Sequence, residues 1–134
     1  RARAAAHSII PTTTGAAKAI TKIFPDLEGK IDGGAIRVPV SNGSMSEITF
    51  NLAESVSIEK VNNAMMDSAK LDLKGILGVI TDPIVSIDIV GSPLSSAYDA
   101  SLSRSFGKVL KITAWYDNEA GYSNRLLELT KKVH

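Results

Sequence analysis

The sequence has 134 residues, of which 44% are hydrophobic and 22% charged, with 15 Lys and Arg against 14 Asp and Glu and no Cys. This near-zero charge balance lacks the basic excess of nucleic-acid-binding proteins, and no apolar run approaches the roughly twenty residues of a membrane-spanning helix. The absence of Cys excludes a disulfide framework, a thiolate zinc site and a cysteine nucleophile supplied by this chain. The chain starts at Arg1 without a secretory leader, so we expect a soluble domain cut from a longer protein.

The first predicted helix follows a cluster of turn-forming residues at positions 11–15. Apolar residues in the segment 16–23 recur at helical spacing, which predicts a helix with one buried face. Thr13 or Thr14 can cap the free N–H groups of this helix, and Pro25 ends it.

Two strands are predicted on either side of Asn42-Gly43. In the segment 35–40, Arg37 alternates with aliphatic residues and therefore lies on the opposite face of the strand. In the segment 47–52, apolar and polar residues alternate again. Because Asn-Gly is the strongest short hairpin signal, we expect these two strands to form an antiparallel pair.

The second half of the chain alternates helices with strands. Ser57 precedes an apolar face of helical period, which predicts a helix ending near Lys70. The segments that follow are predicted, in chain order, as strands at 75–81 and 85–90, a loop or irregular edge at 91–105, a central strand at 108–116 and an amphipathic helix at 121–133. This pattern predicts an α+β fold with a mostly antiparallel sheet, helices on one face and a C-terminal helix.

The Thr-rich segment before the first helix is a candidate anion site. N–H groups without partners and the positive end of the helix dipole converge at a helix start, and the hydroxyls of residues 12–14 add donors beside Gly15. Arg37 is the guanidinium that would complete a phosphate site, because its fork can donate two parallel hydrogen bonds. Composition alone favours the alternatives, a helix cap and a solvated arginine, since these are more frequent.

A second polar and aromatic cluster spans residues 115–124, where a strand is predicted to pass into the last helix. Asn118 offers an amide donor and an acceptor to a ligand there. The alternative, which composition favours, is a capping turn formed by Asp117, Asn118 or Ser123, with Trp115 and Tyr116 buried beneath it.

The order of several motifs resembles the C-terminal part of phosphorylating glyceraldehyde-3-phosphate dehydrogenases. The motifs are RARAAA at 1–6, IIP at 9–11, TTGAAKA at 13–19, RVP at 37–39, LKGILG at 73–78, WYDNE at 115–119 and GYSNR at 121–125. The resemblance spans essentially the whole chain. It reverses the preference for the two alternatives above and implies the catalytic-domain fold type of that family.

The resemblance implies roles for individual residues. Thr14, Gly15 and Arg37 correspond to residues that bind the phosphate of glyceraldehyde 3-phosphate or inorganic phosphate. Asn118 corresponds to a residue that contacts the nicotinamide of the NAD cofactor, and Tyr122 lies in the same neighbourhood. Arg1 and Arg3 resemble the tail of a loop that packs at subunit contacts of a homotetramer.

The resemblance also implies an organisation and an activity for the parent protein. Residues 1–117 correspond to the later part of the catalytic domain and 118–134 to the C-terminal helix region. The NAD-binding domain is absent, and the catalytic Cys and His lie before the start of this chain. The parent is then a cytoplasmic glycolytic oxidoreductase that forms 1,3-bisphosphoglycerate and NADH, while this chain alone is expected to be inactive. The alternatives are an erythrose-4-phosphate dehydrogenase and a free-standing, non-catalytic phosphate-binding or oligomerisation domain.

Overall fold

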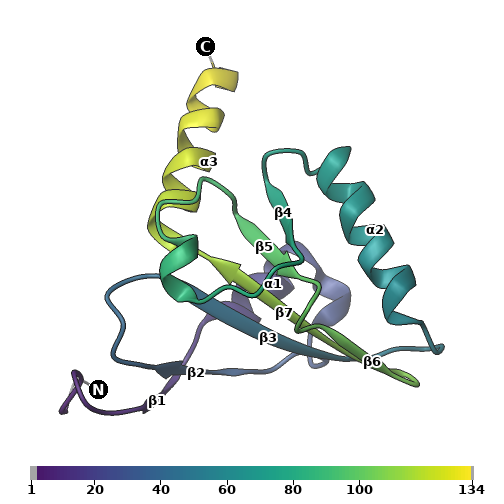
Figure 1. The fold of residues 1–134 in the computed structure, drawn as a ribbon, viewed down its shortest axis with the longest axis horizontal. Coiled ribbons are helices and arrows are strands. Elements are labelled where there is room, and N and C mark those ends of the chain that lie inside the picture. Colours follow the sequence, from purple (N-terminus) through teal and green to yellow (C-terminus); the bar gives the residue numbers. More distant parts are fainter. Residues whose placement is uncertain (1–2, 134) are drawn as a thin grey trace. The chain divides into compact units, whose positions relative to one another are not determined.

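A computed structural model describes residues 3–133, so Arg1 and position 134 lie outside the described residues. The chain forms two compact units that divide after Ser41, and each is described by itself. Figure 1 labels the helices and strands of both units. The elements of the first unit are β1 (Ile10–Thr13), α1 (Ala16–Ile23), the 3₁₀ turn η1 (Pro25–Leu27) and β2 (Gly34–Arg37).

The first unit is a two-stranded antiparallel sheet whose strands are joined through α1. Ile10 lies opposite Arg37, and Thr13 lies opposite Gly34. The turn-forming residues predicted at positions 11–15 overlap a strand, because Pro11 is the second residue of β1. A proline fits here because each strand of a two-stranded sheet has one edge free of ladder bonds.

Helix α1 lies where the sequence predicts it, but its predicted buried face is wrong. The helix covers Ala16–Ile23 and has no buried residue, and 74% of Ile23 is exposed. The apolar spacing therefore identifies the helix correctly, while the two-stranded sheet of its own unit is too small a layer to bury its face.

The second unit is built on a five-stranded sheet. Its elements are β3 (Ser44–Asn51), α2 (Ile58–Lys70), β4 (Leu77–Ile80), η2 (Ser86–Ile89), β5 (Ser96–Asp99), β6 (Arg104–Phe106), β7 (Val109–Tyr116) and α3 (Asn118–Val133). The strand order is β3-β7-β5-β4, with β6 also paired to β7. Only the β4–β5 pair among these is parallel. The α+β fold with a mostly antiparallel sheet and a C-terminal helix is thereby confirmed.

The predicted hairpin around Asn42-Gly43 is wrong. Strand β2 pairs with β1, whereas β3 pairs along its whole length with β7, from Ser44 opposite Tyr116 to Asn51 opposite Val109. The backbone bends at Ser41 and Asn42, and Gly43 has φ +86°. Eight cross-strand pairs with a distant segment outweigh the short-range preference for a hairpin.

The sheet is buried on both faces by different parts of the unit. On one face, Val61 of α2 packs against Tyr98 of β5 and Leu110 of β7. On the other face, Ala97 and Trp115 pack against Ile89 of η2. Strand β7 contributes to both cores because successive side chains alternate across a strand, which confirms its prediction as the central strand.

Two segments between α2 and β7 differ from their predictions. The strand predicted at 85–90 is the 3₁₀ turn η2, closed by a 2.8 Å hydrogen bond from the Val85 N–H to Asp88 Oδ2. The loop predicted at 91–105 contains β5, where Tyr98 and Asp99 are almost completely buried. Its Ser-rich composition conceals this strand, because the serines and Asp99 satisfy one another by hydrogen bonds.

Helix α3 follows β7 directly and begins at Asn118, three residues before its predicted start. Figure 1 shows its last turns extending away from the sheet of its unit. Leu126, Leu127, Leu129 and Val133 are between 47% and 76% exposed. Within residues 3–133, no helix is both long enough and apolar enough to cross a membrane.

Candidate functional site

The three predicted phosphate ligands all lie in the first unit, and two of them stand at the start of α1. Gly15 occupies the N-cap position and no side chain caps the helix from there. The Ala16 N–H instead donates to Thr14 Oγ1 at 3.2 Å, so the capping hydroxyl comes from the residue before the cap. No atom lies within 4 Å of where a Cβ would stand at Gly15, which leaves open space beside the first turn.

Arg37 lies at the other end of the two-stranded sheet from this helix start. Thr13 lies opposite Gly34, and Arg37 is three residues further along the same strand as Gly34. Three strand residues span about 10 Å. Arg37 is exposed, and within the described residues no hydrogen bond or ion pair joins it to Thr14. The structure thus places the three residues in one unit, and a phosphate would have to bridge the remaining gap.

The junction of β7 and α3 is organised by the buried carboxylate of Asp117. Its Oδ1 accepts the N–H groups of Glu119 and Ala120 at 3.0 and 2.9 Å, which makes Asp117 the cap of α3. Its Oδ2 accepts Asn42 Nδ2 at 2.9 Å and the Gly91 N–H at 2.8 Å. The capping alternative predicted for this cluster is therefore correct for Asp117.

The four donors around Asp117 favour its ionised form. The Ala120 and Gly91 N–H groups, aided by Glu119 and Asn42, hold the pKa of the Asp117 carboxyl below its ordinary value of 3.8, and burial opposes this only in part. One negative charge thus holds together the start of β3, the loop at residue 91 and the first turn of α3. We call these residues, Asn42, Gly91, Asp117, Glu119 and Ala120, the Asp117 cluster.

Asn118 and Tyr122 lie one helical turn apart on α3. Asn118 is exposed at the first position of the helix, and 69% of Tyr122 is exposed. Residues four apart share one face of a helix, so both side chains are available to a ligand from the same direction. Asn118 belongs to the second unit, whereas Thr14, Gly15 and Arg37 belong to the first.

A second buried carboxylate, Asp99, lies beneath this junction and was not predicted from the sequence. Its Oδ2 accepts Trp115 Nε1 at 2.8 Å, and its Oδ1 accepts the Ser101 hydroxyl at 2.7 Å and the Leu102 N–H at 3.0 Å. Burial raises the pKa of Asp99, but the hydrogen bonds from Ser101, Trp115 and Leu102 outweigh it and lower the pKa below 3.8. A lone Asp in a Ser-rich segment gives no signal of this network.

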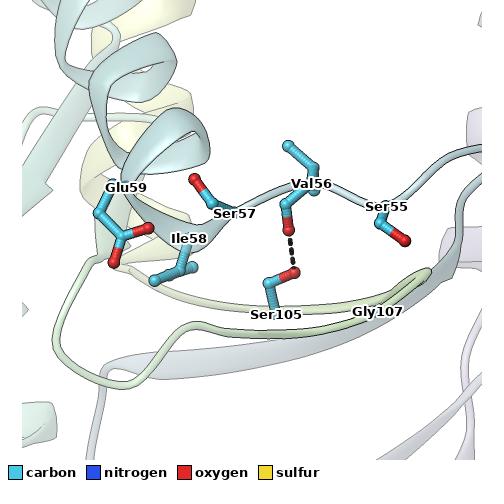
Figure 2. Close-up of a pocket in the computed structure, with 7 residues that line it drawn as sticks. All are labelled: Ser55, Val56, Ser57, Ile58, Glu59, Ser105 and Gly107. Carbon is cyan, nitrogen blue, oxygen red and sulfur yellow. Dashed lines mark hydrogen bonds between the residues drawn. The ribbon is translucent and has the colours of Figure 1, made fainter.

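An open depression of about 440 Å³ lies in the second unit, at the start of α2. Figure 2 shows its lining residues, with the Ser105 hydroxyl donating to the Val56 carbonyl across it. None of the predicted site residues lines it. Within residues 3–133, no group of three or more His, Asp or Glu side chains could hold a metal ion.

Comparison with known proteins finds one family along most of the chain. Residues 1–118 match the family described as "Glyceraldehyde 3-phosphate dehydrogenase, C-terminal domain". A glyceraldehyde-3-phosphate dehydrogenase of Mycolicibacterium smegmatis is 53% identical over 133 residues, which are 99% of this chain and 39% of that relative. The enzymes of the same name from Haloarcula vallismortis and Priestia megaterium are each 49% identical over 99% of this chain and 40% of their own length. The chain therefore spans about two fifths of the length of these relatives.

Proposed function

This chain belongs to the glyceraldehyde-3-phosphate dehydrogenase family, and we propose that it works as the C-terminal part of an NAD-dependent oxidoreductase. The proposed reaction converts glyceraldehyde 3-phosphate, inorganic phosphate and NAD to 1,3-bisphosphoglycerate and NADH. The observation that carries this proposal is the identity of about 50% to named relatives over 99% of the chain. A homotetrameric, cytoplasmic parent acting in glycolysis is part of the same proposal.

Thr14, Gly15 and Arg37 are the proposed phosphate ligands. Open space beside Gly15 supports this role, because the first-turn N–H groups of α1 beyond Ala16, whose N–H Thr14 caps, then face outward. A helix start alone contributes only about 0.3–1 kcal/mol to binding an exposed anion. The exposed guanidinium of Arg37 would supply the charge-assisted hydrogen bonds that a specific phosphate site requires.

Asn118 is the proposed contact with the nicotinamide of NAD. This role is supported by the exposure of Asn118 on the first turn of α3. It directly follows the capping residue Asp117, whose hydrogen bonds from the Glu119 and Ala120 N–H groups fix the backbone after it. The amide of Asn118 can donate to and accept from a carboxamide at the same time. Tyr122, one turn later, would lie beside the same ligand.

The chain by itself is proposed to lack dehydrogenase activity. It contains no Cys that could attack an aldehyde, and its residues 1–117 and 118–134 would supply only the later part of the catalytic domain and the C-terminal helix region. The 134-residue chain should therefore form no NADH from aldehyde, phosphate and NAD. NADH formation by this chain would contradict the assignment, and a reading frame that does not continue upstream of Arg1 would favour the free-standing binding domain.

The phosphate role is tested in a full-length chimera, in which this chain replaces the matching region of the Mycolicibacterium smegmatis relative. Arg37→Ala should raise the KM for inorganic phosphate roughly 10- to 100-fold, because a charge-assisted hydrogen bond contributes about 1.5–3 kcal/mol. The KM for NAD should stay unchanged. Lys22→Ala removes another exposed cation of the same unit and serves as the matched control. Equal losses toward phosphate and NAD would assign Arg37 a structural role.

The same chimera tests the cofactor contact and the substrate. Asn118→Ala should raise the KM for NAD and leave the KM for phosphate unchanged. Glyceraldehyde 3-phosphate should be the preferred aldehyde over erythrose 4-phosphate. A reversed preference would assign the chain to the erythrose-4-phosphate enzyme instead.

A further inference from the structure

Asn42 is chemically distinct among the six asparagines of this chain, because it alone precedes a glycine. The side-chain amide of an asparagine is lost when the backbone nitrogen of the next residue attacks its Cγ. A following glycine offers the least hindrance, since it has no Cβ beside the attacking nitrogen. The other five asparagines are followed by residues with side chains, which makes Asn42 the most susceptible position in the sequence.

The structure brings the reacting groups of Asn42 and Gly43 together. The Gly43 backbone nitrogen lies 2.7 Å from Asn42 Oδ1, to which it donates a hydrogen bond. This contact holds the Gly43 nitrogen beside the amide group whose Cγ it attacks, and holding reactants close together favours their reaction. Asn42 and Gly43 are only half-buried, so water reaches both.

We propose that Asn42 is a site of spontaneous deamidation, and that its product breaks the contact between the start of β3 and the cap of α3. The Gly43 nitrogen loses its proton to solvent and forms a bond to Asn42 Cγ. The Cγ–Nδ2 bond then breaks, and Nδ2 leaves as ammonia after taking up a proton from water. Water opens the resulting five-membered imide at either carbonyl, which yields aspartate or isoaspartate at position 42.

Either product changes the Asp117 cluster in the same direction. Asn42 Nδ2 now donates to Asp117 Oδ2 at 2.9 Å. Deamidation removes this donor and places a second carboxylate against the first, and two like charges at this distance repel each other. Because the Asp117 carboxylate also holds Gly91 and the first turn of α3, the repulsion acts on all three segments.

The isoaspartate product adds a backbone constraint at Gly43. It inserts a methylene into the main chain directly before this residue. Gly43 itself is closely packed, because a Cβ on this residue would lie 2.5 Å from the Ser86 carbonyl oxygen. The longer main chain displaces Gly43, and its close approach to η2 leaves little space for that shift. Neither this constraint nor the charge repulsion depends on the proposed function.

The modification is measured by mass spectrometry after incubating the folded chain in mildly alkaline buffer. Trypsin releases residues 38–60 as one peptide, which contains both Asn42 and Asn51 and so carries its own control. We expect the mass increase for replacing –NH2 by –OH to appear at position 42 first, with Asn51 unchanged over the same time. A second sample in urea gives the reference rate for the unfolded chain.

Two substitutions test the structural consequence. Asn42→Asp reproduces one product, whereas Asn42→Gln keeps an amide that closes a ring much more slowly. We expect Asn42→Asp to lower Tm by roughly 3–5 °C relative to Asn42→Gln, the shift of about 1 kcal/mol in a domain of this size. Gly43→Ala is not a suitable control because of its contact with Ser86.

The outcomes decide whether the folded chain exposes Asn42 to deamidation or protects its amide. Conversion at position 42 ahead of position 51 in the folded chain supports the site, and the same result in the full-length chimera extends it to the assembled protein. Conversion in urea alone would show that the bond to Asp117 protects the amide, which overturns the proposal. Equal Tm values for the two variants would overturn the structural consequence.

Discussion

The hydrogen bond between Trp115 and Asp99 is the contact whose removal most directly tests the architecture of the second unit. Asp99 is fully buried and its two oxygens accept four hydrogen bonds, three at Oδ1 and one, from Trp115 Nε1, at Oδ2. In Asp99→Asn, the amide oxygen can keep the three bonds at Oδ1 only by turning its NH₂ group toward Trp115. Two donors then face each other in the core, and neither has an acceptor.

The size of this effect follows from the bonds that are lost. A hydrogen bond to a charged group contributes about 1.5–3 kcal/mol, and a buried donor without a partner costs about 1–3 kcal/mol. We expect Asp99→Asn to lower the free energy of unfolding by about 2–3 kcal/mol. In a Trp115→Phe background the opposing indole donor is gone, and the same substitution should cost only about 1 kcal/mol. The expected coupling energy between the two positions is therefore about 1–2 kcal/mol.

The assay is urea unfolding of the wild-type chain, the two single variants and the double variant, followed by far-UV circular dichroism. Tryptophan fluorescence is unsuitable because Trp115 is the only Trp and is itself replaced. The slope of the transition should be the same in all four proteins if only stability changes. Additive effects, with a coupling energy below about 0.5 kcal/mol, would refute the reasoning.

Three further predictions concern close packing, capping and pH. Gly121→Ala should destabilise the chain more than Gly78→Ala in urea unfolding. A Cβ would lie 2.6 Å from a Leu94 atom at either position, but at Gly121 that atom is the fixed backbone carbonyl oxygen, whereas at Gly78 it is the side-chain Cδ1, which can move. Ser57→Ala should cost about 1 kcal/mol and speed amide hydrogen exchange in the first turn of α2, because it removes the cap; unchanged exchange would contradict this. Folding lowers the pKa of Asp99, so the stability that its carboxylate contributes is present above pH 3.8 and is lost as the pH falls toward the folded pKa. Asp99→Asn should therefore flatten the decline in Tm below pH 3.8.

The elements that the sequence predicts correctly are those whose determinants are local. Helix α2 has an apolar face of helical period, and its Ser57 cap accepts the Lys60 N–H as expected. Strand β7 alternates its side chains between two buried faces. Such patterns depend only on the geometry of one element, so they can be identified without knowing its partners.

The errors have other origins, the choice of a strand partner in one case and a local side-chain contact in the other. Asn42-Gly43 has the composition of a hairpin turn, but the strand after it pairs with β7 instead of β2. The strand predicted at 85–90 folds into the short turn η2, because the Asp88 carboxylate captures the Val85 N–H. Both outcomes depend on contacts that sequence periodicity does not encode.

The candidate site also has features that the sequence predicts and features that only the structure shows. The sequence identifies Asn118 and its neighbours as a functional or capping cluster, and the structure assigns the cap to Asp117. Contacts to Asp117 from Asn42 and Gly91 join positions 75 and 26 residues away, so the sequence gives no sign of them. The roles of Thr14, Gly15, Arg37 and Asn118 in binding stay predictions for the chimera to test.

The sequence by itself determined the family, the helices with regular apolar periodicity and the central strand, because each is carried by residue types at fixed short spacings. Only the tertiary structure decided which strands pair, that a Ser-rich segment is the buried strand β5, and that Asp99 and Asp117 are buried acceptors. The physical reason is that a carboxylate can be buried only where donors satisfy it, and Trp115, Asn42 and Gly91 supply theirs from distant positions. Those donors are brought together by the fold, after which one charge at Asp117 holds three separate segments in place.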